Sequence, residues 1–319
     1  MRENPIADGK AKPEEQAADR KGKGGPEAEA EPEKDREQKW KERDEEYQHQ
    51  EVLQKSAASA HIVYRAILRE AEEELDRPTV ALAWSGLAAG MSMGFSLVAD
   101  GLLQSRLPDA PWRDLIGKLG YTVGFLILIL GRQQLFTENT LTPVLSLLKR
   151  RDRKTLRNTS RLWGIVLIAN LVGAMAVAYV LQRSTVFSED DRAAFLRISM
   201  EAMQPFRWTL FLKAIFAGWL IAIMVWMLPE AETARIWILV FIPYIVGLGG
   251  LSHIIIGSIY CFYTVAAHQH TWMEYLTHFA WPVLIGNCIG GVALVAFVNY
   301  AQATAGSPDR GASAPDVHD

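Results

Sequence analysis

Six long apolar runs fill most of residues 79–303 and constrain the fold of this 319-residue chain more than any other feature. The runs cover about 79–103, 115–148, 160–182, 207–228, 235–265 and 280–303. About 20 apolar residues in a helix cross the hydrocarbon core of a bilayer, so each run is long enough to span a membrane. The second and fifth are longer than a straight helix needs, so we expect them to be strongly tilted or broken. The sequence therefore predicts an all-α polytopic membrane protein with six transmembrane helices.

Basic residues between the runs predict the orientation of these helices. The connection between the second and third runs, KRRDRKTLRNTSR, is the most basic of them. Short basic loops stay in the cytoplasm during membrane insertion. With six spans, both termini are then cytoplasmic, and we expect a multi-pass protein of the inner (plasma) membrane.

The segments that flank the membrane domain (78–303) differ from it in composition. Residues 1–55 are almost all charged residues, Gln, Gly, Pro and Ala, which predicts a disordered charged cytoplasmic tail. Residues 56–77 carry apolar residues at helical spacing, which predicts an amphipathic helix at the membrane interface or against a neighbouring subunit. The apolar face consists of Val63, Ala66, Ile67, Ala71 and Leu75. We expect residues 304–319 to be a second disordered tail.

The two halves of the apolar region share a pattern of small and amide residues. The matching pairs are Ala89 and Ala217, Gly90 and Gly218, Asn170 and Asn287, and Gly173 and Gly290. The pattern predicts a first repeat over about 79–182 and a second over about 207–303, with the two asparagines and the last glycine pair in structural roles. Each repeat has an odd number of spans, so the two would insert with opposite topology.

Each of the two longest runs contains an interruption. Residues 131–140 read GRQQLFTENT, and residues 245–258 read IVGLGGLSHIIIGS, with three closely spaced glycines and the only histidine of any apolar run. Backbone that is not helical inside a membrane must be buried in protein or line a cavity. We therefore expect spans 2 and 5 to be broken and the two breaks to form one site.

On these motifs the chain resembles the formate/nitrite transporter family. The resemblance covers about residues 56–303 and depends on LFTEN (135–139), GLSH (250–253) and the two NxxG pairs. It implies an aquaporin-like inverted repeat of six spans, with spans 2 and 5 broken. It also implies a homo-oligomer, specifically a pentamer, with one pore in each protomer, and transport of small monovalent anions or their conjugate weak acids.

The resemblance also assigns pore residues. It implies that His253 is the central pore histidine and that Thr137 faces it from a loop shared with Leu135 and Phe136. Tyr121 and Phe125 match a bulky constriction on the cytoplasmic side. The remaining matches are bulky positions near the other break and a basic position in span 4, namely Val246, Leu251 and Lys213.

Several positions differ from the family pattern, so the chain is a divergent member. Acidic residues usually stand immediately before LFT and before the histidine, where this chain has Gln134 and Ser252. Glu138 replaces a small residue, and Arg132 is unusual. We expect Arg132 and Glu138 to form an ion pair that holds the break together. The alternative is that Glu138 faces the pore unpaired and repels anions.

Other ionisable residues allow two interpretations. Lys213 could extend to lipid headgroups or attract anions into an outer vestibule. Asp100 is expected to be solvated near the outer end of the first span, with no role. His270, Glu274 and His278 have the spacing of one helical face, but an amphipathic interfacial helix over HQHTWMEYLTH is favoured over a metal site.

The predicted function is that of a membrane channel or transporter for small monovalent anions or their weak acids. Two alternatives stay open: a channel for water or another neutral solute, and a non-transporting scaffold or sensor that uses its charged tail. No HExxH motif is present, so an enzyme is not expected. We expect the lipid bilayer and copies of the same chain as partners, with no cofactor, no metal and no nucleic acid.

Overall fold

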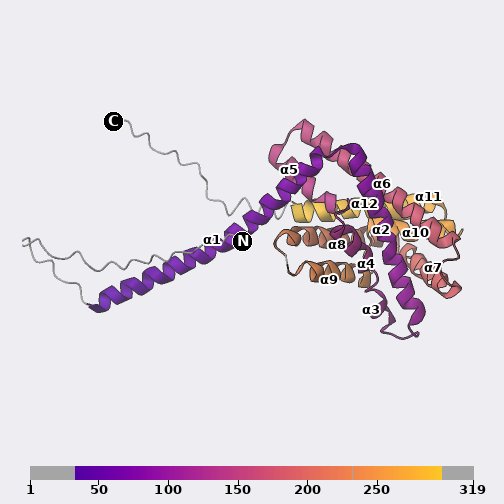
Figure 1. The fold of residues 1–319 in the computed structure, drawn as a ribbon, viewed down its shortest axis with the longest axis horizontal. Helices are drawn as coiled ribbons and strands as arrows, with labels where there is room; N and C mark the ends of the chain where they lie inside the picture. The colour runs from indigo at the N-terminus through magenta and orange to yellow at the C-terminus, as the bar shows by residue number, and fades with distance from the viewer. Residues whose placement is uncertain (1–32, 232, 297–319) are drawn as a thin grey trace, which may run out of the picture. The chain divides into compact units, whose positions relative to one another are not determined.

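A computed structural model of the chain describes residues 33–231 and 233–296, and every regular element within these ranges is a helix (Figure 1). The predicted all-α class is therefore confirmed for the described part. The predicted tails over residues 1–32 and 304–319, and the last seven residues of the sixth run, lie outside the described residues. By internal contacts the chain divides into two units, residues 1–52 and residues 53–319.

The elements follow one another with short connections. They are α1 (Glu33–Asp76), α2 (Thr79–Arg106), α3 (Arg113–Gly117), α4 (Thr122–Leu130), the 3₁₀ turn η1 (Glu138–Thr140), α5 (Thr142–Arg150), α6 (Arg153–Arg183), α7 (Glu189–Met203), α8 (Arg207–Met227), the 3₁₀ turn η2 (Leu228–Glu230), α9 (Arg235–Leu248), α10 (Ile254–Ala266), α11 (Trp272–Glu274), the π-helix η3 (Tyr275–Ala280), α12 (Trp281–Cys288) and the π-helix η4 (Ile289–Ala296).

Among the described residues, three helices are long and apolar enough to cross a membrane. They cover Thr79–Arg106, Arg153–Arg183 and Arg207–Glu230, which correspond to α2, α6 and α8 with η2. The helices α9 and α10 are apolar but shorter. The other apolar runs are divided among several elements: the second into α4 and α5, and the sixth into α12 and η4, which continue from α11 and η3.

Both of the longest runs are broken where the sequence predicts it. In the second, α4 ends at Leu130 and α5 begins at Thr142. In the fifth, α9 ends at Leu248 and α10 begins at Ile254. Gly250 adopts φ 55° in the second break, a left-handed conformation that glycine adopts without steric cost. The first break has its left-handed residue at Arg132, with φ 50°.

The helix α10 is the most buried element in the described part of the chain. All its residues, from Ile254 to Ala266, are buried, and it packs against α2, α6 and α7. A helix that is apolar all round is stable only in such surroundings. The other main contacts join α2 to α6, α8 to α12 and α4 to α9 (Figure 1). The second break is therefore followed directly by α10, a helix that cannot move without unpacking the core.

The prediction of disorder over residues 1–55 is wrong for residues 33–55, which belong to α1. This stretch is rich in Glu, Lys, Gln and Arg, which favour helix formation without a core. Hydrogen bonds between side chains four residues apart also stabilise the helix, as in the bond from Gln48 Nε2 to Asp44 Oδ2 at 3.1 Å. The shortage of apolar residues predicts disorder because such a segment cannot form a hydrophobic core. A solvent-exposed helix of strong helix formers does not need a core.

The second half of α1 packs on the membrane domain through the predicted apolar face. Val63, Ile67, Ala71 and Leu75 are buried, whereas Ala66 is exposed. Val63 and Ile67 share a hydrophobic cluster with Leu141, the N-cap of α5, and with Val144 and Leu145 of α5. The apolar face of residues 56–77, expected at the membrane interface or against a neighbouring subunit, therefore packs against residues of its own chain.

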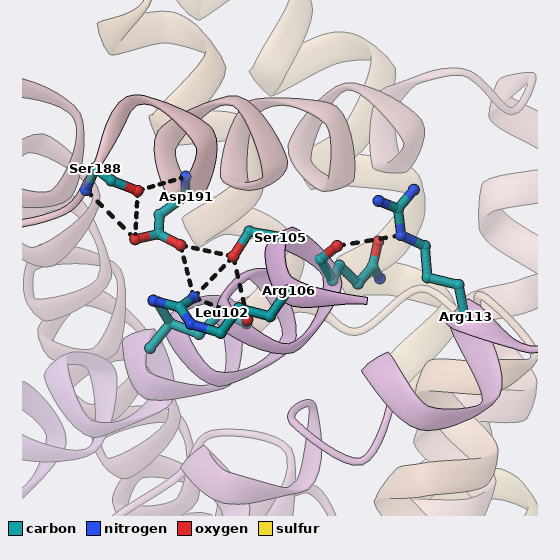
Figure 2. Close-up of polar contacts among 7 residues, drawn as sticks. Leu102, Ser105, Arg106, Arg113, Ser188 and Asp191 are labelled. Carbon is teal, nitrogen blue, oxygen red and sulfur yellow. Dashed lines mark hydrogen bonds and ion pairs between the residues drawn. The ribbon is translucent and has the colours of Figure 1, made fainter. Parts of the chain in front are cut away.

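An element that the sequence analysis did not predict, α7, lies between the third and fourth apolar runs. Ser188 and Asp191 form a capping box at its start. Asp191 Oδ1 also accepts hydrogen bonds from Ser105 Oγ at 2.6 Å and from Arg106 Nη1 at 2.7 Å, both at the end of α2 (Figure 2). The bonds from Ser105, Ser188 and Arg106 hold the pKa of the Asp191 carboxyl well below its usual range.

We expect Asp191→Ala to lower the stability of the protein by about 2–3 kcal/mol, because bonds to a buried charged group are lost. Since the pKa of Asp191 is depressed on folding, its contribution is complete above the ordinary pKa of about 4 and disappears as pH falls through the folded value. Melting temperatures of purified wild type and variant should therefore differ at neutral pH and converge in acid. The exposed neighbour Asp190 provides the control, since Asp190→Ala should melt like wild type at every pH. An equal loss for both variants would contradict the assignment.

Candidate functional site

The two breaks touch each other inside the protein through Thr137 and His253. Thr137 Oγ1 and His253 Nε2 are 2.7 Å apart although 116 residues separate them in the chain. Each side chain is only 1% exposed. The tertiary structure thus joins the two interrupted runs at one buried polar contact.

The local structure determines which nitrogen of His253 donates. His253 is the N-cap of α10, and its Nδ1 accepts a long 3.5 Å bond from the Ile256 N–H. Because an accepting Nδ1 carries no proton, the neutral ring is protonated at Nε2 and donates to Thr137 Oγ1. Thr137 is held in turn by η1, where Thr140 Oγ1 donates to its carbonyl oxygen at 2.7 Å.

An aromatic column leads away from the imidazole. The Phe125 ring meets the His253 ring edge-on at a centroid distance of 5.4 Å. Tyr121, one turn earlier on α4, stacks on Phe125 at 5.7 Å. Phe136 instead packs against Trp163, and Leu135 is fully buried in the core.

Two asparagines hold the backbone of the breaks in the same way. Asn287 Oδ1 accepts from the Ile254 N–H at 2.8 Å, and its Nδ2 donates to the carbonyl oxygens of Ser252 at 2.9 Å and Ala214 at 2.8 Å. The side chain of one residue therefore bonds to the backbone on both sides of His253. Buried backbone groups without helical partners need such replacements.

Asn170 repeats this pattern at the first break. Its Oδ1 accepts from the Phe136 N–H at 2.9 Å, and its Nδ2 donates to Gln134 O at 2.9 Å and Gly86 O at 2.7 Å. Gln134 and Phe136 flank Leu135 as Ser252 and Ile254 flank His253. The position that holds the imidazole in one half thus holds an aliphatic side chain in the other.

The paired glycines allow the helices that carry these asparagines to pack closely. A Cβ atom at Gly90 would overlap the backbone of Asn170, and one at Gly218 would overlap the backbone of Asn287. Gly173 and Gly290 are equally close to the carbonyl oxygens of Leu87 and Ile215. Any larger side chain at these positions would move an asparagine away from its break.

A cavity of about 290 Å³ reaches His253 from one side, and we call it the lysine cavity. Six of the predicted pore residues line it: Tyr121, Lys213, Val246, Leu251, Ser252 and His253. Tyr121 therefore lies on the same side of the imidazole as Lys213. A cytoplasmic Tyr121 and an outer Lys213 would lie on opposite sides of the imidazole, but the two residues share this cavity, because the turn from α3 into α4 places Tyr121 beside Gly247.

Lys213 lies in this cavity rather than along the outer surface of α8. It is half-buried, and its Nζ lies next to Gly250 in the second break, 3.3 Å from where a Cβ would stand. No ion pair of Lys213 occurs within residues 33–231 and 233–296. Its ammonium group therefore contributes an unneutralised positive charge close to the break.

A second cavity, of about 600 Å³, lies at the first break, and we call it the glutamate cavity. Arg132 and Glu138 line it together with Glu70, Glu73 and Glu74 of α1. The predicted ion pair between Arg132 and Glu138 is absent from the described residues. Arg132 is exposed at a left-handed residue after α4, whereas Glu138 Oε1 is buried in η1 with no hydrogen-bond partner in the described ranges.

Asp100 was expected to be solvated, but its side chain is buried. It is 0% exposed, forms an ion pair with Lys118 Nζ at 2.8 Å and accepts a bond from Gln104 Nε2 at 2.7 Å. The segment around α3 folds back over the end of α2 and covers it. Lys118 also lines the lysine cavity, so the ion pair lies at the edge of the site.

Two of the three residues with metal-like spacing, Glu274 and His278, have other partners. Glu274 accepts bonds from the backbone and hydroxyl of Thr271, and His278 Nε2 lies 3.1 Å from the carbonyl oxygens of Met203 and Pro205. No group of three or more potential metal ligands occurs among the described residues. The expected separate interfacial helix is instead the start of the last apolar helix, which begins at Trp272.

Sequence reasoning missed two groups at the site. The Asp100–Lys118 pair could not be found, since no spacing rule connects the end of one run with the start of the next. Tyr260 also lines the lysine cavity. It stands seven residues after His253, two turns further along the same helical face, so the helical period could have indicated it.

Comparisons with known proteins agree on one family. The family model described as formate/nitrite transporter matches residues 61–301. The inner membrane protein YfdC of Escherichia coli (strain K12) is 40% identical over 243 residues, which cover 76% of this chain and 78% of that protein. The formate channel BtFdhC of Bacillus thuringiensis is 24% identical, with 74% and 92% covered. A solved pentameric formate channel with formate bound has a TM-score of 0.59 at 19% identity, with 70% of this chain and 96% of that chain covered.

Proposed function

Since the chain belongs to the formate/nitrite transporter family, which consists of channels and transporters rather than enzymes, we propose that it carries small monovalent anions or their conjugate weak acids across a membrane. The observation that carries this proposal is the buried contact between Thr137 and His253, with the lysine cavity reaching His253 and the glutamate cavity lined by Glu138, the residue after Thr137. Relatives named as formate channels support the substrate class.

In this proposal His253 is the central group of the pore and Thr137 is its partner. The other pore residues are Tyr121, Phe125, Leu135, Phe136, Val246, Leu251, Ser252 and Lys213 on the path, with Arg132 and Glu138 at the glutamate cavity. The support is that eight of the twelve residues line one of the two cavities. The remaining four, Phe125, Leu135, Phe136 and Thr137, belong to the packed layer around the imidazole.

Charge and burial suggest how an anion would pass. Lys213 raises the local concentration of anions in the lysine cavity. A carboxylate cannot cross the packed layer unpaired, because burying a bare charge is prohibitive. If a hydronium ion first protonates the ring at Nδ1, at the expense of the bond from the Ile256 N–H, the imidazolium of His253 can give its Nε2 proton to the anion. A neutral acid and an imidazole protonated at Nδ1 result. The acid then passes the apolar layer, and a hydronium ion from the bulk solution returns a proton to the ring and leaves a water molecule.

The architecture of this proposal is a six-span, aquaporin-like inverted repeat that assembles as a pentamer. The equal bonding of Asn170 and Asn287 to their breaks supports two related halves. The pentameric formate channel that resembles this chain supports the assembly. The protein would lie in the inner membrane, as the name of the Escherichia coli relative says of that protein, with both termini in the cytoplasm.

Flux into proteoliposomes tests the function. We expect formate and nitrite to enter faster than into empty vesicles, with a rate that rises as external pH falls, because protonation accompanies passage. Acetate, lactate and hydrosulfide define the range of substrates. Water or glycerol flux without any anion flux would support a neutral-solute channel instead. An assembled protein that moves none of these solutes would exclude transport and leave the scaffold function.

A further inference from the structure

Two tyrosines that line the lysine cavity have hydroxyl groups without a hydrogen-bond partner in the described part of the chain. The hydroxyl oxygens of Tyr121 and Tyr260 are buried, and neither has a hydrogen-bond partner within residues 33–231 and 233–296. The residues are 4% and 7% exposed, and both line this cavity. A buried hydroxyl without a partner costs free energy, so such a pair needs an explanation.

Three other tyrosines have hydroxyl groups that are hydrogen-bonded within the protein. Tyr244 donates to Leu115 O at 2.8 Å, Tyr263 donates to Arg192 O at 3.3 Å, and Tyr275 bonds with Ser258 Oγ at 3.0 Å. None of these three side chains lines the lysine cavity. The two buried tyrosine hydroxyls without a partner in the described residues thus both belong to side chains that line the cavity leading to His253.

The surroundings of the two phenols fit a small oxyanion. The cavity, of about 290 Å³, also exposes Lys213, which has no ion pair in the described part of the chain, and Lys118, which Asp100 holds at 2.8 Å. Two carboxylates, Asp114 and Glu201, also line it, and Glu201 is paired with Arg197 at 3.6 Å. Phenol donors bond strongly to charged oxygens, and each of two donors can take one oxygen of a carboxylate or nitrite.

From these observations we infer that Tyr121 and Tyr260 form an oxyanion-binding subsite in the lysine cavity, with one hydroxyl donating to each of two oxygens of the anion. The inference rests on the proposed function and adds the residues that hold the substrate before it reaches His253. The stacking of Tyr121 on Phe125, and of Phe125 on His253, joins the subsite to the central imidazole. The anion exchanges water for two phenol donors here, which lowers its desolvation cost.

Tyr121→Phe, Tyr260→Phe and the double variant test this subsite, because they remove only the hydroxyls. We expect each single change to raise the formate concentration for half-maximal flux about tenfold, as for loss of a bond to a charged group. Direct binding is measured by the rise in melting temperature of purified protein in sodium formate, with equal sodium chloride as the reference. The same tenfold higher formate should be needed for equal stabilisation. Without ligand, the variants should melt no lower than wild type, since the removed hydroxyls have no partner.

Tyr275→Phe is the matched control, because its hydroxyl is bonded to Ser258 and does not line the cavity. It should leave the formate dependence unchanged and lower the melting temperature. A wild-type protein that moves no formate would overturn the proposed function itself. A wild-type protein that moves formate, with unchanged half-saturation in all three cavity variants, would overturn the subsite alone. An equal loss of flux at all formate concentrations would also overturn it, since this indicates a changed pore width and not lost binding.

Discussion

Asn287→Leu is expected to prevent accumulation of folded protein. The change removes three bonds and leaves the Ile254 N–H and the carbonyl oxygens of Ser252 and Ala214 buried without partners. Each orphaned group costs about 1–3 kcal/mol, so the sum approaches the whole stability of a typical domain. Size-exclusion chromatography of detergent-solubilised protein should show aggregate in place of the wild-type peak.

Asn287→Asp separates lost bonds from lost packing. The carboxylate keeps the acceptor for Ile254 but loses both donor bonds, so we expect a milder defect with some assembled protein. Asn170→Leu should behave like Asn287→Leu, because Asn170 makes the equivalent three bonds at the first break. Wild-type yield and melting temperature for Asn287→Leu would show that the second break does not depend on this side chain.

His253→Asn is expected to reduce formate flux by at least about tenfold and to remove its rise at low pH, because the bond to a charged group and the proton-exchanging imidazole are lost. The fold should survive. Asparagine is a good N-cap, so it can replace the acceptor that Nδ1 offers to α10. Initial rates in proteoliposomes between pH 5 and pH 8, about 1.5 units on either side of the usual histidine pKa of about 6.5, measure both effects.

Variants of Thr137 provide the comparison for this experiment. Thr137→Val removes the hydroxyl that His253 contacts at 2.7 Å and keeps the shape, whereas Thr137→Ser keeps the hydroxyl. We expect reduced flux for valine and near wild-type flux for serine. If His253→Asn retained both the rate and the pH response with a wild-type melting temperature, the central role of the imidazole would be refuted.

The sequence predicts the structure best at positions where the residues present allow few backbone conformations. Gly250 and the polar run after Leu130 cannot continue a lipid-facing helix, so the positions of the breaks were readable from the chain. The pairing of Asn170 with Asn287 was visible as an internal repeat. Their hydrogen bonds were not, since the carbonyl groups of Gly86 and Ala214 lie far away in sequence.

Charged residues were predicted least well. Proximity in sequence favoured an ion pair between Arg132 and Glu138, but the left-handed turn at Arg132 leaves its side chain exposed. Position near a helix end favoured a solvated Asp100, but the segment around α3 covers it and supplies Lys118. In both cases the outcome depends on the path of a connection, which hydropathy does not specify.

The sequence by itself determined the all-helical class, the long apolar helices and the places where two of the runs break, because the period of apolar residues and the backbone preferences of glycine act locally. Only the tertiary structure decided that Thr137 meets His253, that Tyr121 shares a cavity with Lys213, and that α7 is fastened to α2 through Asp191. These contacts join residues far apart in the chain. They depend on how whole helices pack, and helix packing is a property of complementary surfaces that no single segment carries.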